Sequence, residues 1–320
     1  MIKSHTILVL GEILVEFVSH TKNCALASIG EYSGPYPSGA PAIFADQAAR
    51  VGGRAVMVGG LGADGFGRST LQRLQDDRVD VNQIVMNPEL ATGVAFVSYF
   101  DDGSRDFIYH IAGSAADSFQ DADLRPLTGP VVLHVSAASL GSPVIRPRIL
   151  SALAAVRAAG GKISCDPNAR PELMRDQTAR EALETVIAHS DILLPSTSDL
   201  NYLYPGLSET AALAHLLQGH AGIVALKRGN RGALVIGPDQ QFELAPHPVT
   251  EIDPTGAGDC FCGTFIGLLT QGFSLFEAGR HANAAGALAV TRRGPMEGNT
   301  SLAEIRGLLA VQDAAEPGSF

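Results

Sequence analysis

The chain has 320 residues and a formal net charge of −10, from 23 basic and 33 acidic side chains. Apolar residues make up 46% and charged residues 18%, which suits a globular core and excludes wholesale disorder. The sequence has no basic run that could follow a nucleic-acid backbone and no apolar stretch of about 18 residues that could cross a membrane, so we expect neither partner. The four cysteines show neither disulfide nor zinc spacing, which favours a reducing, cytoplasmic setting.

The N-terminal segment is typical of a strand whose end carries a ligand site. Residues 6 to 10 form a continuous apolar run that stops at a glycine, as in a buried parallel strand. Glu12 and Glu16 follow. Because ligands of open α/β sheets bind at the carboxyl ends of strands, these carboxylates are candidate ligand contacts, with a solvated edge as the alternative. Residues 32 to 41 are rich in Pro, Gly and Ser and predict a loop, followed by a helix over residues 42 to 51.

A glycine pattern follows a second predicted strand over residues 54 to 60. Gly60-Leu61-Gly62-Ala63-Asp64-Gly65 fits the Gly-x-Gly-x-x-Gly fingerprint of dinucleotide-binding proteins. The context argues against a nicotinamide cofactor, because the pattern lies outside the first strand–helix unit and Asp80 follows too closely to be the acidic ribose ligand. A nicotinamide oxidoreductase would therefore rest on this pattern alone.

Two alternating segments predict a β-hairpin. Residues 92 to 100 and 105 to 111 alternate between faces, and Asp101-Asp102-Gly103-Ser104 separates them. A hairpin is out of place between the strand–helix units of a doubly wound sheet, so we interpret it as part of a lid. Arg105 is a candidate to bind a hydroxyl or carboxylate of a substrate, with a solvated strand arginine as the alternative.

The middle of the chain alternates strands with helices. The strands are predicted over residues 131 to 135, 162 to 165 and 191 to 194, and the helices over residues 145 to 159 and 178 to 190. This order indicates a parallel sheet with helices on both faces. Asp166-Pro167-Asn168-Ala169-Arg170 comes at a strand end, again on the ligand edge. A capped turn would explain Asp166 and Asn168 but not Arg170.

The stretch Asp253-Pro254-Thr255-Gly256-Ala257-Gly258-Asp259 carries the clearest chemistry. Pro254 fixes a turn, and Gly256 and Gly258 permit close approach to the backbone. A helix predicted to begin near Gly258 leaves N–H groups that suit phosphate oxygens. A phosphate cradle alone has no use for Asp259, whereas phosphoryl transfer needs a carboxylate there to take the proton of the acceptor hydroxyl. The alternative is a first-turn acid favoured by the helix dipole.

This motif resembles the C-terminal signature of the PfkB, or ribokinase-like, family of carbohydrate kinases. Further resemblance at residues 39 to 67, 166 to 170 and 227 to 232 extends it over nearly the whole chain. It implies a single ribokinase-like domain over residues 1 to 320. The expected fold is an α/β fold with three layers (αβα) and a mostly parallel central sheet. It also implies a small β lid from roughly residues 12 to 38 and 88 to 112.

The resemblance implies ATP-dependent phosphorylation of a sugar's primary hydroxyl, with Mg²⁺ and with K⁺ left open as a second ion. Asp259 would be the base, while the N–H groups of Gly256, Ala257 and Gly258 would hold the charge of the transferred group. The implied sugar-binding residues are Glu12, Glu16, Gly39, Ala40, Arg105, Asn168, Arg170 and Asp259. The implied nucleotide-binding residues are Ser196, Lys227, Gly229, Gly232, Thr255, Gly256, Gly258 and Asn283. Asp199 would reach the metal through water.

The sugar is less sharply defined, because the chain departs from the family pattern. Ser38 and Ile43 stand where the sugar loop has Gly and Asn, which argues against a ribose- or adenosine-type pocket. The sequence is nearest the tagatose/fructose kinase and 2-keto-3-deoxygluconate kinase branch. We expect a ketohexose of the tagatose or fructose type. The keto acid is the alternative, since Arg105 and Arg170 together would suit a carboxylate. A non-catalytic sugar-binding regulator and a homodimer formed through the lid stay open.

Overall fold

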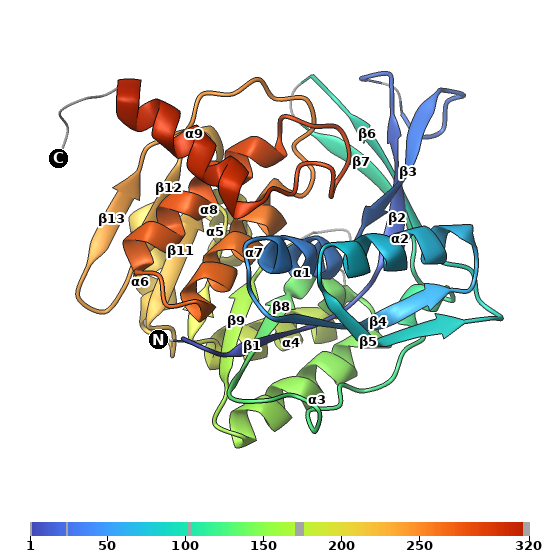
Figure 1. Ribbon diagram of the computed structural model, residues 1–320, viewed down its shortest axis with the longest axis horizontal. Coiled ribbons are helices and arrows are strands. Elements are labelled where there is room, and N and C mark those ends of the chain that lie inside the picture. Colours follow the sequence, from blue (N-terminus) through green and yellow to red (C-terminus); the bar gives the residue numbers. More distant parts are fainter. Residues whose placement is uncertain (1, 24, 102–103, 170–175, 316–320) are drawn as a thin grey trace.

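The computed structural model describes residues 2–23, 25–101, 104–169 and 176–315 (Figure 1). Arg170, one of the residues expected to bind the sugar, lies outside the described residues. Among the described helices, none combines the length and apolar character needed to span a membrane.

Within the described residues, the larger of two sheets has nine strands in the order β13–β12–β11–β10–β9–β8–β1–β4–β5. The strands from β11 to β5 run parallel, and β12 and β13 add to one edge in antiparallel fashion. The strands are β1 (Thr6–Leu10), β4 (Ala55–Gly62), β5 (Asp80–Asn87), β8 (Val131–Ser136), β9 (Lys162–Asp166), β10 (Ile192–Leu193), β11 (Ile223–Lys227), β12 (Ala233–Ile236) and β13 (Gln241–Leu244).

Helices cover both faces of this sheet, as expected (Figure 1). One face is covered by α1 (Ala40–Arg50), α2 (Gly65–Asp76), α7 (Ala257–Thr270), α8 (Leu275–Ala289) and α9 (Leu302–Ala315). The other is covered by α3 (Ile145–Ala158), α4 (Gln177–His189), α5 (Thr197–Leu203) and α6 (Glu209–Leu217). In β1, Ile7 and Val9 belong to the first apolar core and Leu8 and Leu10 to the second. A strand buried on both faces must be apolar throughout, which explains the continuous apolar run over residues 6 to 10.

A smaller sheet, with four strands in the part of the chain that the structure describes, has the order β3–β2–β6–β7 and lies at the upper right of Figure 1. It consists of β2 (Leu14–Ser19), β3 (Tyr32–Ser38), β6 (Gly93–Tyr99) and β7 (Arg105–His110). The predicted hairpin is confirmed as β6 and β7, which pair antiparallel. The loop predicted over residues 32 to 41 is wrong, because β3 pairs with β2. Pro35 and Pro37 are tolerated since β3 is an edge strand, where a missing N–H leaves no partner unpaired.

Candidate active site

A cavity of about 1120 Å³ lies where loops that follow the parallel strands meet the smaller sheet. Every predicted site residue that the structure describes lines it. These residues are Glu12, Glu16, Gly39, Ala40, Arg105, Asn168, Ser196, Asp199, Lys227, Gly229, Gly232, Thr255, Gly256, Ala257, Gly258, Asp259 and Asn283. Their convergence follows from the topology, because the carboxyl ends of parallel strands share one edge of the sheet. Their individual roles stay predictions.

The N-terminal end of α7 forms an anion-binding turn in this cavity. Gly256 has φ of 80°, and a Cβ there would lie 2.2 Å from the carbonyl oxygen of Pro295, so the position requires glycine. The first hydrogen bond of the helix runs from the N–H of Cys260 to the carbonyl of Gly256 at 2.8 Å. Helical geometry therefore leaves the amides of Ala257 and Gly258 without an intrahelical acceptor. Together with the helix dipole they present a positive end to the cavity.

Asp259 lies in the same turn of α7, half-buried and in the wall of the cavity. A carboxylate within one turn of an anion-binding helix end can take a proton from a hydroxyl that attacks the bound phosphate. The fold thus places a carboxylate and a helix end suited to anions on consecutive residues of one helix.

Lys227, at the end of β11, adds a positive charge beneath this turn. Its Nζ donates to Oδ2 of Asp166 at 2.5 Å and lies 3.4 Å from Sγ of Cys262. Burial opposes the charge of the lysine, but the negative charges around it, Asp166 foremost and Asp199 with it, together outweigh burial, and the pKa of Lys227 is raised above its ordinary value. A Cβ at Gly258 would lie 3.5 Å from this Nζ. A charged ammonium is therefore within reach of an anion bound at α7.

Two buried carboxylates line the part of the cavity under the smaller sheet. Glu12 is 6% exposed and accepts a hydrogen bond from the hydroxyl of Ser139, and burial raises the pKa of Glu12 to about 7. Glu16 is 4% exposed, and its Oε2 accepts from the hydroxyl of Ser38 at 3.2 Å. Such carboxyl groups suit a ligand with several hydroxyls, because each oxygen can accept further hydrogen bonds.

Asp199 has a structural role as well as a place in the cavity wall. It forms with Ser196 the capping box that starts α5, accepting from the Ser196 N–H and hydroxyl, both at 2.6 Å. Its Oδ1 accepts from the N–H of Ala169 at 2.8 Å. Among the described residues, no three His, Cys, Asp or Glu side chains group in a way that could hold a metal. The residues present fit Mg²⁺ held mainly by phosphates and water, with one or two carboxylates nearby.

The glycine fingerprint near residue 60 serves packing. A Cβ at Gly60 would lie 2.0 Å from the carbonyl oxygen of Ala115, and one at Gly62 would lie 2.5 Å from the backbone nitrogen of Thr92. Asp64 caps α2 by accepting from the N–H of Gly67 at 2.8 Å. None of these glycines lines the large cavity. The pattern thus reflects close backbone contacts rather than a dinucleotide site.

Several cavity residues carry no sequence motif. Phe107 and Tyr109 lie on the same face of β7 as Arg105. The alternation of the strand could have identified them, because every second residue shares a face. Pro246 and Val249 line the cavity from the loop after β13, where neither a periodic pattern nor a motif marks them.

Comparison with known proteins assigns the family. A model described as pfkB family carbohydrate kinase matches residues 4–302, so the chain belongs to the PfkB family of carbohydrate kinases. This confirms the predicted three-layer fold and sugar kinase class.

Solved structures and curated relatives agree over nearly the whole chain. An E. coli protein provisionally called ribokinase II, solved with ATP and Mg²⁺, has a TM-score of 0.88 and 40% identity, covering 96% of this chain and 99% of its own. The fructokinase of Vibrio cholerae O395, solved with fructose, ADP and calcium, has a TM-score of 0.82 and 27% identity, with coverage of 96% and 99%. Fructokinase-1 of Oryza sativa subsp. japonica is 30% identical, with coverage of 96% and 98%.

Proposed function

We propose that this kinase transfers the terminal phosphoryl group of ATP to a primary hydroxyl of a ketohexose, with fructose as the leading substrate. The observation that carries the proposal is Asp259 in the first turn of α7, beside the anion-binding amides and Lys227, in one cavity. The fructokinases among the similar proteins support fructose, and the E. coli relative solved with ATP and Mg²⁺ supports the donor and the ion.

In the proposed mechanism, Asp259 takes the proton of the sugar hydroxyl as the hydroxyl oxygen attacks the terminal phosphorus of ATP. The bond from that phosphorus to the bridging oxygen breaks, and ADP leaves. The amides of Gly256, Ala257 and Gly258, with the Lys227 ammonium, hold the charge on the transferred group. When bound, Mg²⁺ would neutralise charge on the ATP phosphates, and Asp199 would help to hold it through water.

Nucleotide and sugar occupy opposite ends of the cavity in this proposal. Ser196, Gly229, Gly232, Thr255 and Asn283 hold ATP near the ends of β10 and β11 and along α8. The smaller sheet closes over the sugar as a lid, which excludes water and limits hydrolysis of ATP.

We place the protein in the cytoplasm, because the reaction draws on ATP and the described cysteines are free and buried.

The charges under the lid support a neutral sugar. Glu12 and Glu16 can accept hydrogen bonds from hydroxyls, whereas a keto acid would bring its own carboxylate close to them. Arg105, Asn168 and the backbone at Gly39 and Ala40 supply the donors on this side. A sugar with many hydroxyls therefore matches the described residues better than a sugar acid does.

The test is a coupled ADP-release assay with Mg²⁺ and ATP. Fructose, tagatose, ribose and 2-keto-3-deoxygluconate are compared, with ATP alone as the baseline. We expect kcat/KM for a ketohexose to exceed the values for ribose and the keto acid at least about tenfold, since a mismatched polar group in a built site is rejected strongly. Preference for the keto acid would overturn the ketohexose assignment. Baseline rates with all four sugars would contradict the proposed function and favour a non-catalytic sugar-binding protein.

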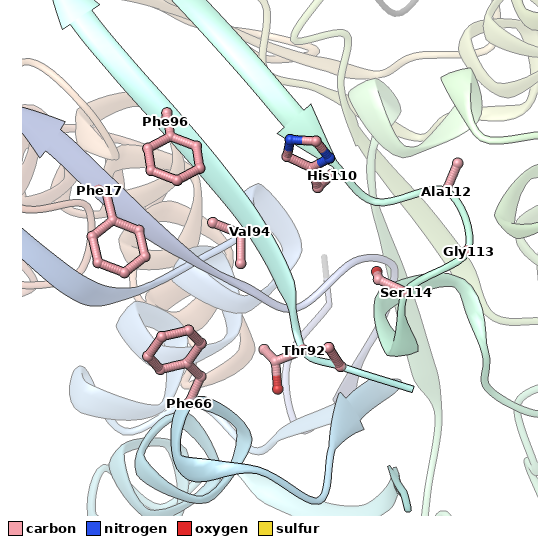
Figure 2. Close-up of a pocket in the computed structure, with 10 residues that line it drawn as sticks. Phe17, Phe66, Thr92, Val94, Phe96, His110, Ala112, Gly113 and Ser114 are labelled. Atoms are coloured by element: carbon pink, nitrogen blue, oxygen red, sulfur yellow. The ribbon is translucent and has the colours of Figure 1, made fainter. Parts of the chain in front are cut away.

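We further propose that two copies associate through the outer face of the lid. The rings of Phe17 on β2 and Phe96 on β6 meet that of Phe66, from the first turn of α2, around a pocket of about 540 Å³ (Figure 2). Phe17 and Phe96 stack with centroids 5.3 Å apart, and Phe66 is 36% exposed. Partly exposed aromatic surface on the two central strands of a small sheet is suited to protein–protein contact.

Sedimentation velocity tests this association. We expect a dimer for the unaltered protein and a monomer for Phe66→Asp, because a buried unpaired carboxylate opposes contact between apolar faces. Phe276→Asp is the matched control, since Phe276 is 37% exposed but lies on α8, away from the lid. A monomer at all concentrations, or equal effects of the two substitutions, would contradict the proposed interface.

A further inference from the structure

Tyr99 links the small sheet to the loop that enters α7. It is the last residue of β6, and its hydroxyl contacts Oδ1 of Asp253 and Oγ1 of Thr255, more than 150 positions later in the chain. Burial and the negative charge of Asp253 raise the pKa of Tyr99, so its hydroxyl stays protonated and can donate.

Asp253 is the centre of this contact. It is 1% exposed, and its two oxygens accept hydrogen bonds from different segments. Oδ1 accepts from the N–H of Thr255 at 3.0 Å, and Oδ2 from the N–H of Gly294 at 2.9 Å. The adjacent carbonyl of Pro295 leaves room for glycine alone at position 256. Asp253 therefore fixes the path of the chain into the anion-binding turn, and Tyr99 attaches that path to the small sheet.

Tyr99 itself does not line the cavity, but the residues that it touches or pairs with do. Thr255 lines the cavity at the phosphate-binding end. Arg105 pairs with Tyr99 across β6 and β7 and lines the cavity on the lid side. The N–H of Asn23 donates to the Tyr99 carbonyl at 2.8 Å, which joins the β2–β3 connection to the same point. Tyr99 thus occupies the junction between the lid and the catalytic loop.

We propose that Tyr99 is a positioning residue that fastens the closed lid to the loop of Asp253 and Thr255, so that a sugar held under the lid orders the phosphate-binding end of α7. The inference rests on the proposed function, because it assumes that the small sheet closes over a sugar. Coupling of this kind is reciprocal. A sugar that stabilises the contact of Tyr99 with Asp253 and Thr255 therefore also strengthens the binding of nucleotide.

The first test compares Tyr99→Phe with the unaltered protein, using whichever sugar the latter phosphorylates. We expect kcat/KM for the sugar to fall about tenfold, as expected for the loss of a hydrogen bond to a charged group. We also expect more than one ADP to be released per sugar phosphate formed, because a loosened lid admits water. Tyr32→Phe is the matched control, since it removes a hydroxyl from β3, where the ring packs against Phe96 outside the cavity.

Three results separate this inference from the proposed function and from a merely structural role. Failure of the unaltered protein to phosphorylate any sugar contradicts the proposed function. If the unaltered protein phosphorylates a sugar and Tyr99→Phe keeps the same kcat/KM and the same ratio of one ADP per product, the inference alone is overturned. A variant that melts at a lower temperature but keeps this ratio also overturns it, because it shows a structural contact without coupling.

Substitutions at Thr255 test the same link from the other side and stay informative if Tyr99→Phe is unstable, and a double-mutant cycle joins the two where both variants fold. Thr255→Val removes the partner hydroxyl, and Thr255→Ser retains it. If Tyr99 acts through Thr255, the double variant Tyr99→Phe/Thr255→Val is no slower than the slower single variant. Thr255→Ser keeps the partner hydroxyl, so Tyr99→Phe should still lower kcat/KM when it is combined with Thr255→Ser. Independent effects that multiply in the double variant would show that the two hydroxyls do not act together, and would overturn the inference.

Discussion

Replacing Asp259 with asparagine is expected to lower kcat for sugar phosphorylation at least about a hundredfold, the scale on which a positioned general base contributes. The substitution keeps the size of the side chain but removes the proton acceptor beside the amides of Ala257 and Gly258. Binding of sugar and ATP should change much less, because the anion-binding turn and Lys227 stay in place. The measurements are kcat from the coupled assay and both dissociation constants from calorimetry.

Glu277→Gln is the matched control for the alternative role of Asp259. Both residues are acids in the first turn of a helix, where the helix dipole favours negative charge by about 0.3 to 1 kcal/mol. If Asp259 serves only the helix, the two substitutions have similar small effects on melting temperature and neither affects kcat. Retention of kcat within about threefold in Asp259→Asn would therefore remove Asp259 from the mechanism.

The fold was predictable where the pattern of side chains is local. Strands buried on both faces, such as β1, are continuous apolar runs, and the hairpin of β6 and β7 alternates with turn residues between its strands. Strand β3 was not predictable from its composition. Its prolines and glycine are typical of a loop, and they are accommodated because the strand lies at the edge of the small sheet.

The site was predictable through motifs but not through contacts. The turn around Asp259 and the basic end of β11 have compositions that suit a phosphate, and the topology brings them together. Pairing between distant residues leaves no local trace, so the Tyr99–Asp253 link and the Lys227–Asp166 ion pair required the structure. Asp199 is the opposite case, because Ser196-Thr197-Ser198-Asp199 has the local spacing of a capping box, which indicates the start of α5 from the sequence.

Alanine in place of Gly258 should slow the enzyme while leaving the fold intact or more stable. A Cβ at this position meets no atom closer than Nζ of Lys227, at 3.5 Å, which is an ordinary van der Waals contact. Alanine also favours a helix over glycine by up to about 1 kcal/mol. The new methyl group projects into the cavity between the α7 amides and Lys227, where the transferred phosphoryl group would lie. We expect kcat to fall about tenfold or more and the melting temperature to stay level or rise.

Gly65→Ala is the matched control for the expected combination of a lower kcat with an unchanged or higher melting temperature. Gly65 also lies in the first turn of a helix, a Cβ there meets nothing within 4 Å, and it is outside the cavity. It should share the effect of Gly258→Ala on melting temperature and leave kcat unchanged. Loss of activity together with a lower melting temperature in Gly258→Ala would show damage to the fold instead. Unchanged kcat would place the phosphoryl group elsewhere. A slower but equally stable enzyme locates the transferred group at the end of α7 independently of Asp259.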